Sequence, residues 1–285
     1  MTRPQDQDGA TDPGLRGRPR YEMPTVFGPS LIPSVSVWGQ VEMVSVSFVT
    51  DRSAAAALVP PGIHIGTERP AVTVSRMTYR DVDYLAGGGY NEVTVGVAAS
   101  VDDEGGQVRG SYQPVVWVDE QIPIQIGREF LGYAKVPGRL PPVQTSAGVA
   151  RFTLWEGNTQ LITGCASGLR PISPDRLDAI RRSAAEVTVI GWKYIPSLAG
   201  APDADYPTRI PLRFDWDSVS AGSGELSFAT PAWNEAPVGA RIVAALSRLP
   251  VRGSCRSMVA VGSGSIDRLA ARRLHPRRKV AGRAG

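Results

Sequence analysis

The sequence predicts a β-rich α+β fold, with a large antiparallel sheet system and only a few short helices. Apolar and polar residues alternate in several short segments, which is the pattern of half-buried strands. The chain also contains 31 glycines and 24 prolines among 285 residues, an excess that favours many turns over a helical bundle. With 42% hydrophobic and 20% charged residues, the composition excludes a collagen-like or wholly disordered chain.

Strands are expected where the alternation is clearest. Segments 44–48 and 93–97 place valines and one phenylalanine at every second position. Six further candidates are residues 113–118, 149–155, 187–195, 209–215, 224–229 and 256–261, most of them separated by Gly, Pro, Asp or Ser clusters.

Three short helices are expected between these strands. Asp51 can cap an Ala-rich turn that Pro60 ends. Ser173-Pro174 supplies a cap and a first-turn proline for the second helix, and the third covers residues 237–247. We expect all three to pack outside a barrel.

The chain is predicted to form one domain, at residues 25–268. Residues 1–24 are polar and rich in Gly, Pro and Asp, which predicts a disordered leader. Residues 269–285 are expected to form a basic disordered tail. No internal repeat or interdomain linker is evident within the predicted domain.

The net charge of +4 does not by itself indicate a nucleic-acid binder. Seven basic residues lie between Arg268 and Arg283, and the rest of the chain is mildly acidic. A basic chain end is typically solvated, so we expect no nucleic-acid partner. The alternative predicts salt-sensitive binding that is lost when residues 269–285 are deleted.

The chain has few residues that could form a metal site or a catalytic triad. The two histidines are His64 and His275, and the two cysteines, Cys165 and Cys255, form no C-x-x-C pair. A Ser-His-Asp triad and a histidine-centred metal site are therefore not expected. Because no signal-peptide core or apolar run of 18 residues is present, we expect a cytoplasmic protein without membrane contact.

The chain has only three lysines, so each is informative. Lys279 belongs to the tail, and Lys193 lies in a predicted strand where its stem can cover apolar surface. Lys135 lies among Tyr133, Ala134 and Val136. Burial among such neighbours disfavours an ammonium ion and favours a nucleophilic amine.

Two motifs resemble the acetoacetate decarboxylase family. The run Gly127-Arg128-Glu129-x-x-x-Tyr133-x-Lys135 resembles the segment that carries the family's imine-forming lysine, and Tyr90-Asn91-Glu92 resembles its aromatic-x-Glu element. With weaker matches, the resemblance covers roughly residues 40–265. It implies a closed antiparallel β-barrel with a flanking sheet and a few short helices, in which Lys135 and Glu92 face the interior.

Three polar groups of the family pattern are missing. Val136 stands where the family has a second lysine, the family's arginine falls at about Gln40 or Val41, and its second acid falls near Met77. Amine chemistry is therefore expected to be retained, whereas acetoacetate is a less expected substrate.

The resemblance implies a cofactor-free lyase that forms a Schiff base between Lys135 and a small oxo acid. Decarboxylation and aldol condensation with dehydration both remain open. Glu92 is expected to carry protons, and Arg128, Tyr133 and Tyr90 are expected to contact substrate. Arg128 is preferred over Glu129 on the assumption that the two lie in a strand and face opposite sides. Family members generally assemble, so a homo-oligomer is expected.

An alternative of a different class is a catalytically inactive barrel. Such a barrel would bind an apolar small molecule or act as a structural partner.

Overall fold

The computed structural model describes residues 20–275, so residues 1–19 of the predicted leader (1–24) and residues 276–285 of the predicted tail (269–285) lie outside the described residues. The strands are β1 Val35–Val49, β2 Ile63–His64, β3 Ala71–Val82, β4 Tyr90–Asp103, β5 Gly106–Val118, β6 Lys135–Pro137, β7 Gln144–Ser146, β8 Val149–Glu156, β9 Thr159–Pro171, β10 Val187–Ile195, β11 Ala204–Phe228, β12 Arg252–Asp267 and β13 Arg272–Arg273. The helices are α1 Arg52–Ala56, α2 Gln121–Gln125, α3 Pro174–Ala184 and α4 Ala240–Ser247, with a π-helix at Ile126–Leu131 and 3-10 turns at Thr25–Phe27 and Asp83–Leu85.

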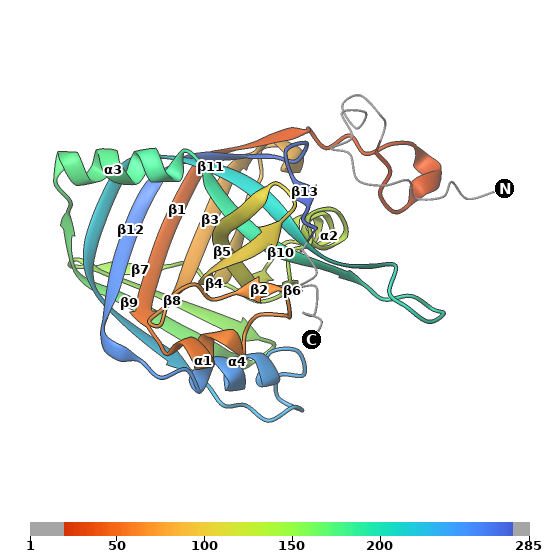
Figure 1. The fold of residues 1–285 in the computed structure, drawn as a ribbon. Helices are drawn as coiled ribbons and strands as arrows, with labels where there is room; N and C mark the ends of the chain where they lie inside the picture. Colours follow the sequence, from red (N-terminus) through yellow and green to blue (C-terminus); the bar gives the residue numbers. More distant parts are fainter. Residues whose placement is uncertain (1–19, 276–285) are drawn as a thin grey trace.

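Seven strands close into a barrel, which confirms the predicted fold class (Figure 1). Their order around the barrel is β10, β5, β4, β3, β1, β12 and β11, and β11 pairs again with β10. All these pairings are antiparallel except β5 with β10, which is parallel and joins Ser111 and Tyr112 to Val189 and Ile190. Closure removes the exposed edges of the sheet.

Strand β11 leaves the barrel and builds the flanking sheet. Its first part pairs with β10, its middle with β12, and its last part with β9, which continues into β8 and β7. The prediction of separate strands at 209–215 and 224–229 was wrong, because the small residues between them stay paired with β12 and a bulge at Trp216/Ser218 absorbs the irregularity. Strands β3 and β9 were not predicted.

Alternation along the barrel strands divides the side chains between two environments. On β4, Glu92 and Thr94 face the interior, whereas Val93 and Val95 belong to an outer hydrophobic core. That core also contains Phe152 from β8 and residues of β9 and α4. The barrel wall is therefore apolar outside and mixed inside, which places its polar side chains around the interior cavity.

The helices match the prediction in part. The helices at α1, α3 and α4 are confirmed, although the Asp51 carboxylate pairs with Arg252 instead of capping α1. Helix α2 and the π-helix were not predicted, so the assumption that Arg128 and Glu129 lie in a strand was wrong. None of the helices within residues 20–275 is long and apolar enough to cross a membrane.

The packed fold continues past the predicted boundary at residue 268. Arg272 and Arg273 form β13 on β11, and Leu274 is fully buried. Arg272 forms an ion pair of 2.6 Å with buried Asp103, which also accepts a hydrogen bond from the backbone of His275. The prediction of a frayed tail from residue 269 was therefore wrong for residues 269–275, since apolar burial and a carboxylate partner hold them against the barrel.

Candidate active site

The barrel interior holds a cavity of about 300 Å³. Its ionisable lining residues other than tyrosines are Glu92, Lys135 and Arg268. The wall is otherwise largely aromatic and aliphatic, and its further lining residues include Trp38, Met43, Met77, Tyr79, Tyr84, Tyr90, Leu131, Tyr133, Leu212 and Phe214. A concave, largely apolar space with a few polar groups is the usual form of a small-molecule site.

Local backbone geometry places Lys135 in this cavity. The π-helix ends at Leu131 and is capped by Gly132, whose φ of 84° is readily adopted by glycine. The chain then runs beside β5, where Lys135 pairs with Val116 in parallel register. A Cβ atom at Gly127 would lie 2.6 Å from Cδ of Lys135. The glycine therefore leaves the space through which the lysine side chain passes.

Lys135 and Glu92 form a buried pair. The two side chains are 8% and 10% exposed, and Lys135 Nζ lies 3.3 Å from Glu92 Oε2. The other carboxylate oxygen, Oε1, accepts a hydrogen bond of 2.8 Å from the Tyr79 hydroxyl. This arrangement fits the register of the sheet, in which Met77 lies opposite Glu92 and Tyr79 lies opposite Tyr90.

Buried tyrosines surround the pair. Lys135 Nζ lies 5.5 Å from the ring centre of Tyr90 and 5.3 Å from that of Tyr133, distances typical of cation–π contacts. Burial, reinforced by the Glu92 carboxylate, raises the pKa of Tyr79, Tyr90 and Tyr133 well above its ordinary value. These hydroxyls therefore stay protonated at neutral pH and can act as hydrogen-bond donors.

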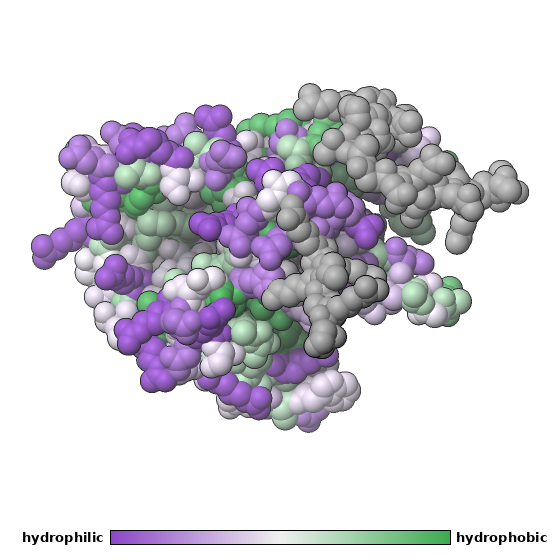
Figure 2. Space-filling view, viewed as in Figure 1, coloured by the Kyte–Doolittle hydropathy of each residue, from purple (hydrophilic) through white to green (hydrophobic). Residues whose placement is uncertain are grey.

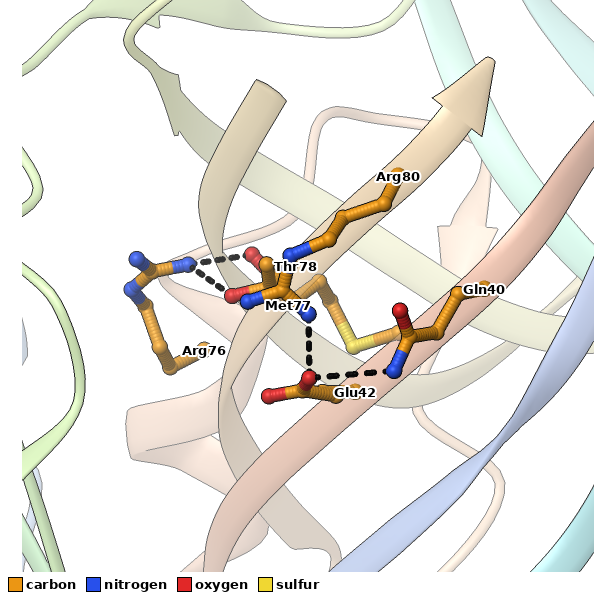
Figure 3. A network of polar contacts seen from close by, with 6 residues as sticks. All are labelled: Gln40, Glu42, Arg76, Met77, Thr78 and Arg80. Atoms are coloured by element: carbon orange, nitrogen blue, oxygen red, sulfur yellow. Dashed lines mark hydrogen bonds and ion pairs between the residues drawn. The ribbon is translucent and has the colours of Figure 1, made fainter. Parts of the chain in front are cut away.

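The positions at which the family's arginine and second acid were expected carry no charged side chain that lines the cavity. Met77 lines the cavity where the second acid was expected, and Val41 is fully buried in the apolar cluster that includes Trp38. Gln40 does not line the cavity. It lies in a polar network with Glu42 and Arg80 across β1 and β3 (Figure 3).

Arg128 does not line the Lys135 cavity. It is exposed, and its Nη1 donates a hydrogen bond of 2.9 Å to the Lys135 carbonyl. Arg128, Glu129 and Lys193 line a separate surface pocket. The structure therefore brings together Lys135, Glu92, Tyr90 and Tyr133, while Arg128 lies outside the cavity and donates to the Lys135 carbonyl.

Three ionisable cavity residues were not identified from the sequence. Tyr79 hydrogen-bonds Glu92 and comes from the unpredicted strand β3, where period-two spacing from Met77 was the available signal. Tyr84 follows β3, and Arg268 had been assigned to the basic tail. Within residues 20–275, no group of three or more His, Cys, Asp and Glu side chains could hold a metal ion.

The closed barrel and its internal cavity define a class of protein that acts on a small molecule inside a β-barrel. A sequence model of the acetoacetate decarboxylase family matches residues 22–266. The chain therefore belongs to the acetoacetate decarboxylase family. This membership indicates that the chain is an acetoacetate decarboxylase-like enzyme. No curated protein matches the chain.

Solved structures share the fold at low sequence identity. An acetoacetate decarboxylase is 19% identical with a TM-score of 0.69, covering 91% of this chain and 97% of its own. The acetoacetate decarboxylase of Legionella pneumophila is 18% identical with a TM-score of 0.67, covering 84% and 89%. The enduracididine biosynthesis enzyme MppR, complexed with pyruvate, is 18% identical with a TM-score of 0.65, covering 90% and 98%.

Proposed function

We propose that this chain is a lyase in which the Lys135 amine forms an imine with a small oxo acid. The observation that carries the proposal is the buried pair of Lys135 and Glu92 inside a cavity of about 300 Å³. An amine must be unprotonated to attack a carbonyl. Glu92 Oε2 is suited to take the proton, because it lies 3.3 Å from Nζ and no hydrogen bond to it is found within the described residues.

In the first step, Nζ attacks the ketone carbon. The former carbonyl oxygen takes one proton from Nζ and one from the protonated Glu92 and leaves as water, which gives an iminium ion and restores the Glu92 carboxylate. The positive nitrogen then accepts the electron pair of a bond at the neighbouring carbon. In a β-oxo acid that bond joins the carboxylate carbon, which leaves as CO2. In pyruvate it is a C–H bond of the methyl group, and Glu92 receives the proton. Both routes give an enamine.

The enamine has two possible outcomes. Protonation at carbon and hydrolysis of the iminium release a ketone and restore the free amine. Addition to an aldehyde forms a carbon–carbon bond, and loss of water followed by hydrolysis releases a condensed oxo acid. The buried hydroxyls of Tyr90 and Tyr133 can donate to oxygen atoms that gain negative charge along either route, whereas the single O–H of Tyr79 already donates to Glu92.

Reductive trapping tests the proposal. The chain is incubated with pyruvate or acetoacetate and borohydride, and peptides are analysed by mass spectrometry. A reduced adduct is expected at Lys135 and not at Lys193, the half-buried lysine outside the cavity. Lys135→Met is the matched control. An unmodified Lys135 under saturating oxo acid contradicts the proposal and favours the inactive barrel.

Labelled substrates distinguish the two routes. MppR has been solved with pyruvate and with the condensation product of pyruvate and imidazole 4-carboxaldehyde, so pyruvate with an aldehyde is a natural first trial. Released CO2 and a new carbon–carbon bond give separate NMR signals.

A homo-oligomer remains our prediction. The segment before β1 projects from the barrel (Figure 1) and exposes Tyr21, Val26, Phe27 and Leu31. A second apolar site is Leu198 in the projecting hairpin between β10 and β11, where Figure 2 shows hydrophobic colour at the tip. Exposed apolar residues of this kind often mark interfaces. Light scattering should therefore give a mass of at least twice 30.4 kDa.

A further inference from the structure

A second buried cation lines the cavity that contains Lys135. Arg268 follows the last residue of β12 and is only 3% exposed. It is the one arginine among the residues that line this cavity. The sequence around it, with basic residues at 272, 273, 277 and 278, had suggested a solvated chain end.

The guanidinium of Arg268 is incompletely partnered. Its Nη1 donates to the Pro33 carbonyl, and its Nε has no hydrogen-bond partner among the described residues. No carboxylate of residues 20–275 lies within ion-pair distance of it. Burial lowers the pKa of Arg268, the expected direction for a cation removed from water without a close anion.

The nearby acids do not replace such an anion. The carboxylates of Asp83 and Glu22 raise the pKa of Arg268, but their effects are smaller than the lowering caused by burial. The Asp83 carboxylate is already occupied, because it accepts hydrogen bonds from the backbone of Val37 and of Tyr84. Buried charged groups are normally paired, so a negatively charged ligand would supply what this site lacks.

Two tyrosines connect Arg268 with the reacting lysine. The guanidinium lies 5.1 Å from the ring centre of Tyr84, and Lys135 Nζ lies 5.5 Å from that of Tyr90. Burial is the largest cause of the raised pKa of Tyr90, and the neighbouring Tyr84 is the second. The two cations therefore line one aromatic-walled cavity, although they lie 133 residues apart in the sequence.

We propose that Arg268 binds the carboxylate of the oxo acid while Lys135 attacks its ketone. This inference rests on the proposed function, and it identifies the substrate as an anionic ketone. A guanidinium can hold both oxygens of a carboxylate through parallel hydrogen bonds. Arg268 thus supplies, from the end of β12, the cation that β1 does not supply at Gln40 or Val41.

The same contact favours a reaction that keeps the bound carboxylate. Loss of CO2 moves the negative charge of a carboxylate into the iminium, so an ion pair stabilises the reactant more than the transition state. Loss of a proton from the carbon next to the iminium leaves the carboxylate unchanged. Arg268 therefore favours enamine formation from an acid such as pyruvate, with the proton passing to Glu92 and no release of CO2.

The test compares an anionic and a neutral ketone in wild type, Arg268→Gln and Arg268→Lys. The readout is the concentration of pyruvate or acetone that half-saturates borohydride trapping at Lys135. In Arg268→Gln this concentration should rise about 10- to 100-fold for pyruvate and stay within about twofold for acetone. Arg268→Lys should recover part of the pyruvate effect. Equal pyruvate values in wild type and Arg268→Gln, or equal losses with both ketones, overturn the proposal.

A non-reacting carboxylate separates this inference from the proposed function. Isobutyrate has no ketone, and its binding is measured by calorimetry with the same three proteins. At least tenfold weaker binding to Arg268→Gln supports the carboxylate site even if Lys135 is never labelled, in which case only the imine proposal fails. Binding that is absent in wild type or equal in both proteins overturns it. Circular dichroism establishes that each variant is folded.

Discussion

The pair of Lys135 and Glu92 can be tested without any substrate, by a double-mutant cycle. Lys135→Met keeps a long apolar side chain without the amine, and Glu92→Gln keeps the shape of the carboxylate without its charge. At 3.3 Å and an effective dielectric constant near 20, the two charges attract by about 5 kcal/mol. Desolvation offsets much of this attraction because both side chains are at most 10% exposed.

We expect Lys135→Met to lower the free energy of unfolding by about 3 kcal/mol, since it leaves a buried carboxylate with Tyr79 as its one remaining donor among the described residues. In a chain of this length, that loss lowers Tm by about 6–12 °C. The double variant should lose about 1–3 kcal/mol less than the sum of the single variants.

Urea unfolding of the four proteins at pH 7 supplies the cycle. The matched control cycle combines Glu92→Gln with Lys193→Met, because Lys193 does not line the cavity. The losses of unfolding free energy in this control cycle should be additive. A coupling between Lys135 and Glu92 within about 0.5 kcal/mol of zero would refute the reasoning, because two buried charges at that distance cannot be independent.

Three further predictions concern the cavity and the end of the fold. Because burial raises the pKa of Tyr79, the stability from its protonated hydroxyl is fully present below pH 10 and falls as pH rises further. Tyr79→Phe should therefore lose about 1 kcal/mol less than wild type between pH 9 and pH 11, measured by urea unfolding; an equal loss would contradict the burial of the hydroxyl. Gly127→Ala should displace the Lys135 side chain and reduce trapping at least tenfold with little change in circular dichroism, whereas Gly66→Ala, where a Cβ meets no atom within 4 Å, should leave trapping unchanged. Leu274→Ala should lower the free energy of unfolding by about 2–5 kcal/mol; a change below about 0.5 kcal/mol would argue that residues 269–275 do not belong to the packed fold.

The sequence predicted part of this architecture because period-two alternation is a local property. Segments 44–48 and 93–97 alternate strongly, and both lie in barrel strands. The continuity of β11 could not be predicted, since small residues resemble a turn unless a neighbouring strand pairs with them. Arg128 was misplaced for a related reason, because nothing in the local pattern distinguishes a π-helix from an irregular strand.

The sequence by itself determined which residues are chemically unusual. Lys135 stands out because lysine is so rare in this chain, and Glu92 stands out through its aromatic-x-Glu element. Only the tertiary structure decided which side chains share the cavity with them. Tyr79 reaches Glu92 through the pairing of β3 with β4, and Arg268 reaches the cavity from the end of β12. Barrel closure joins segments more than a hundred residues apart, and no local pattern carries that information.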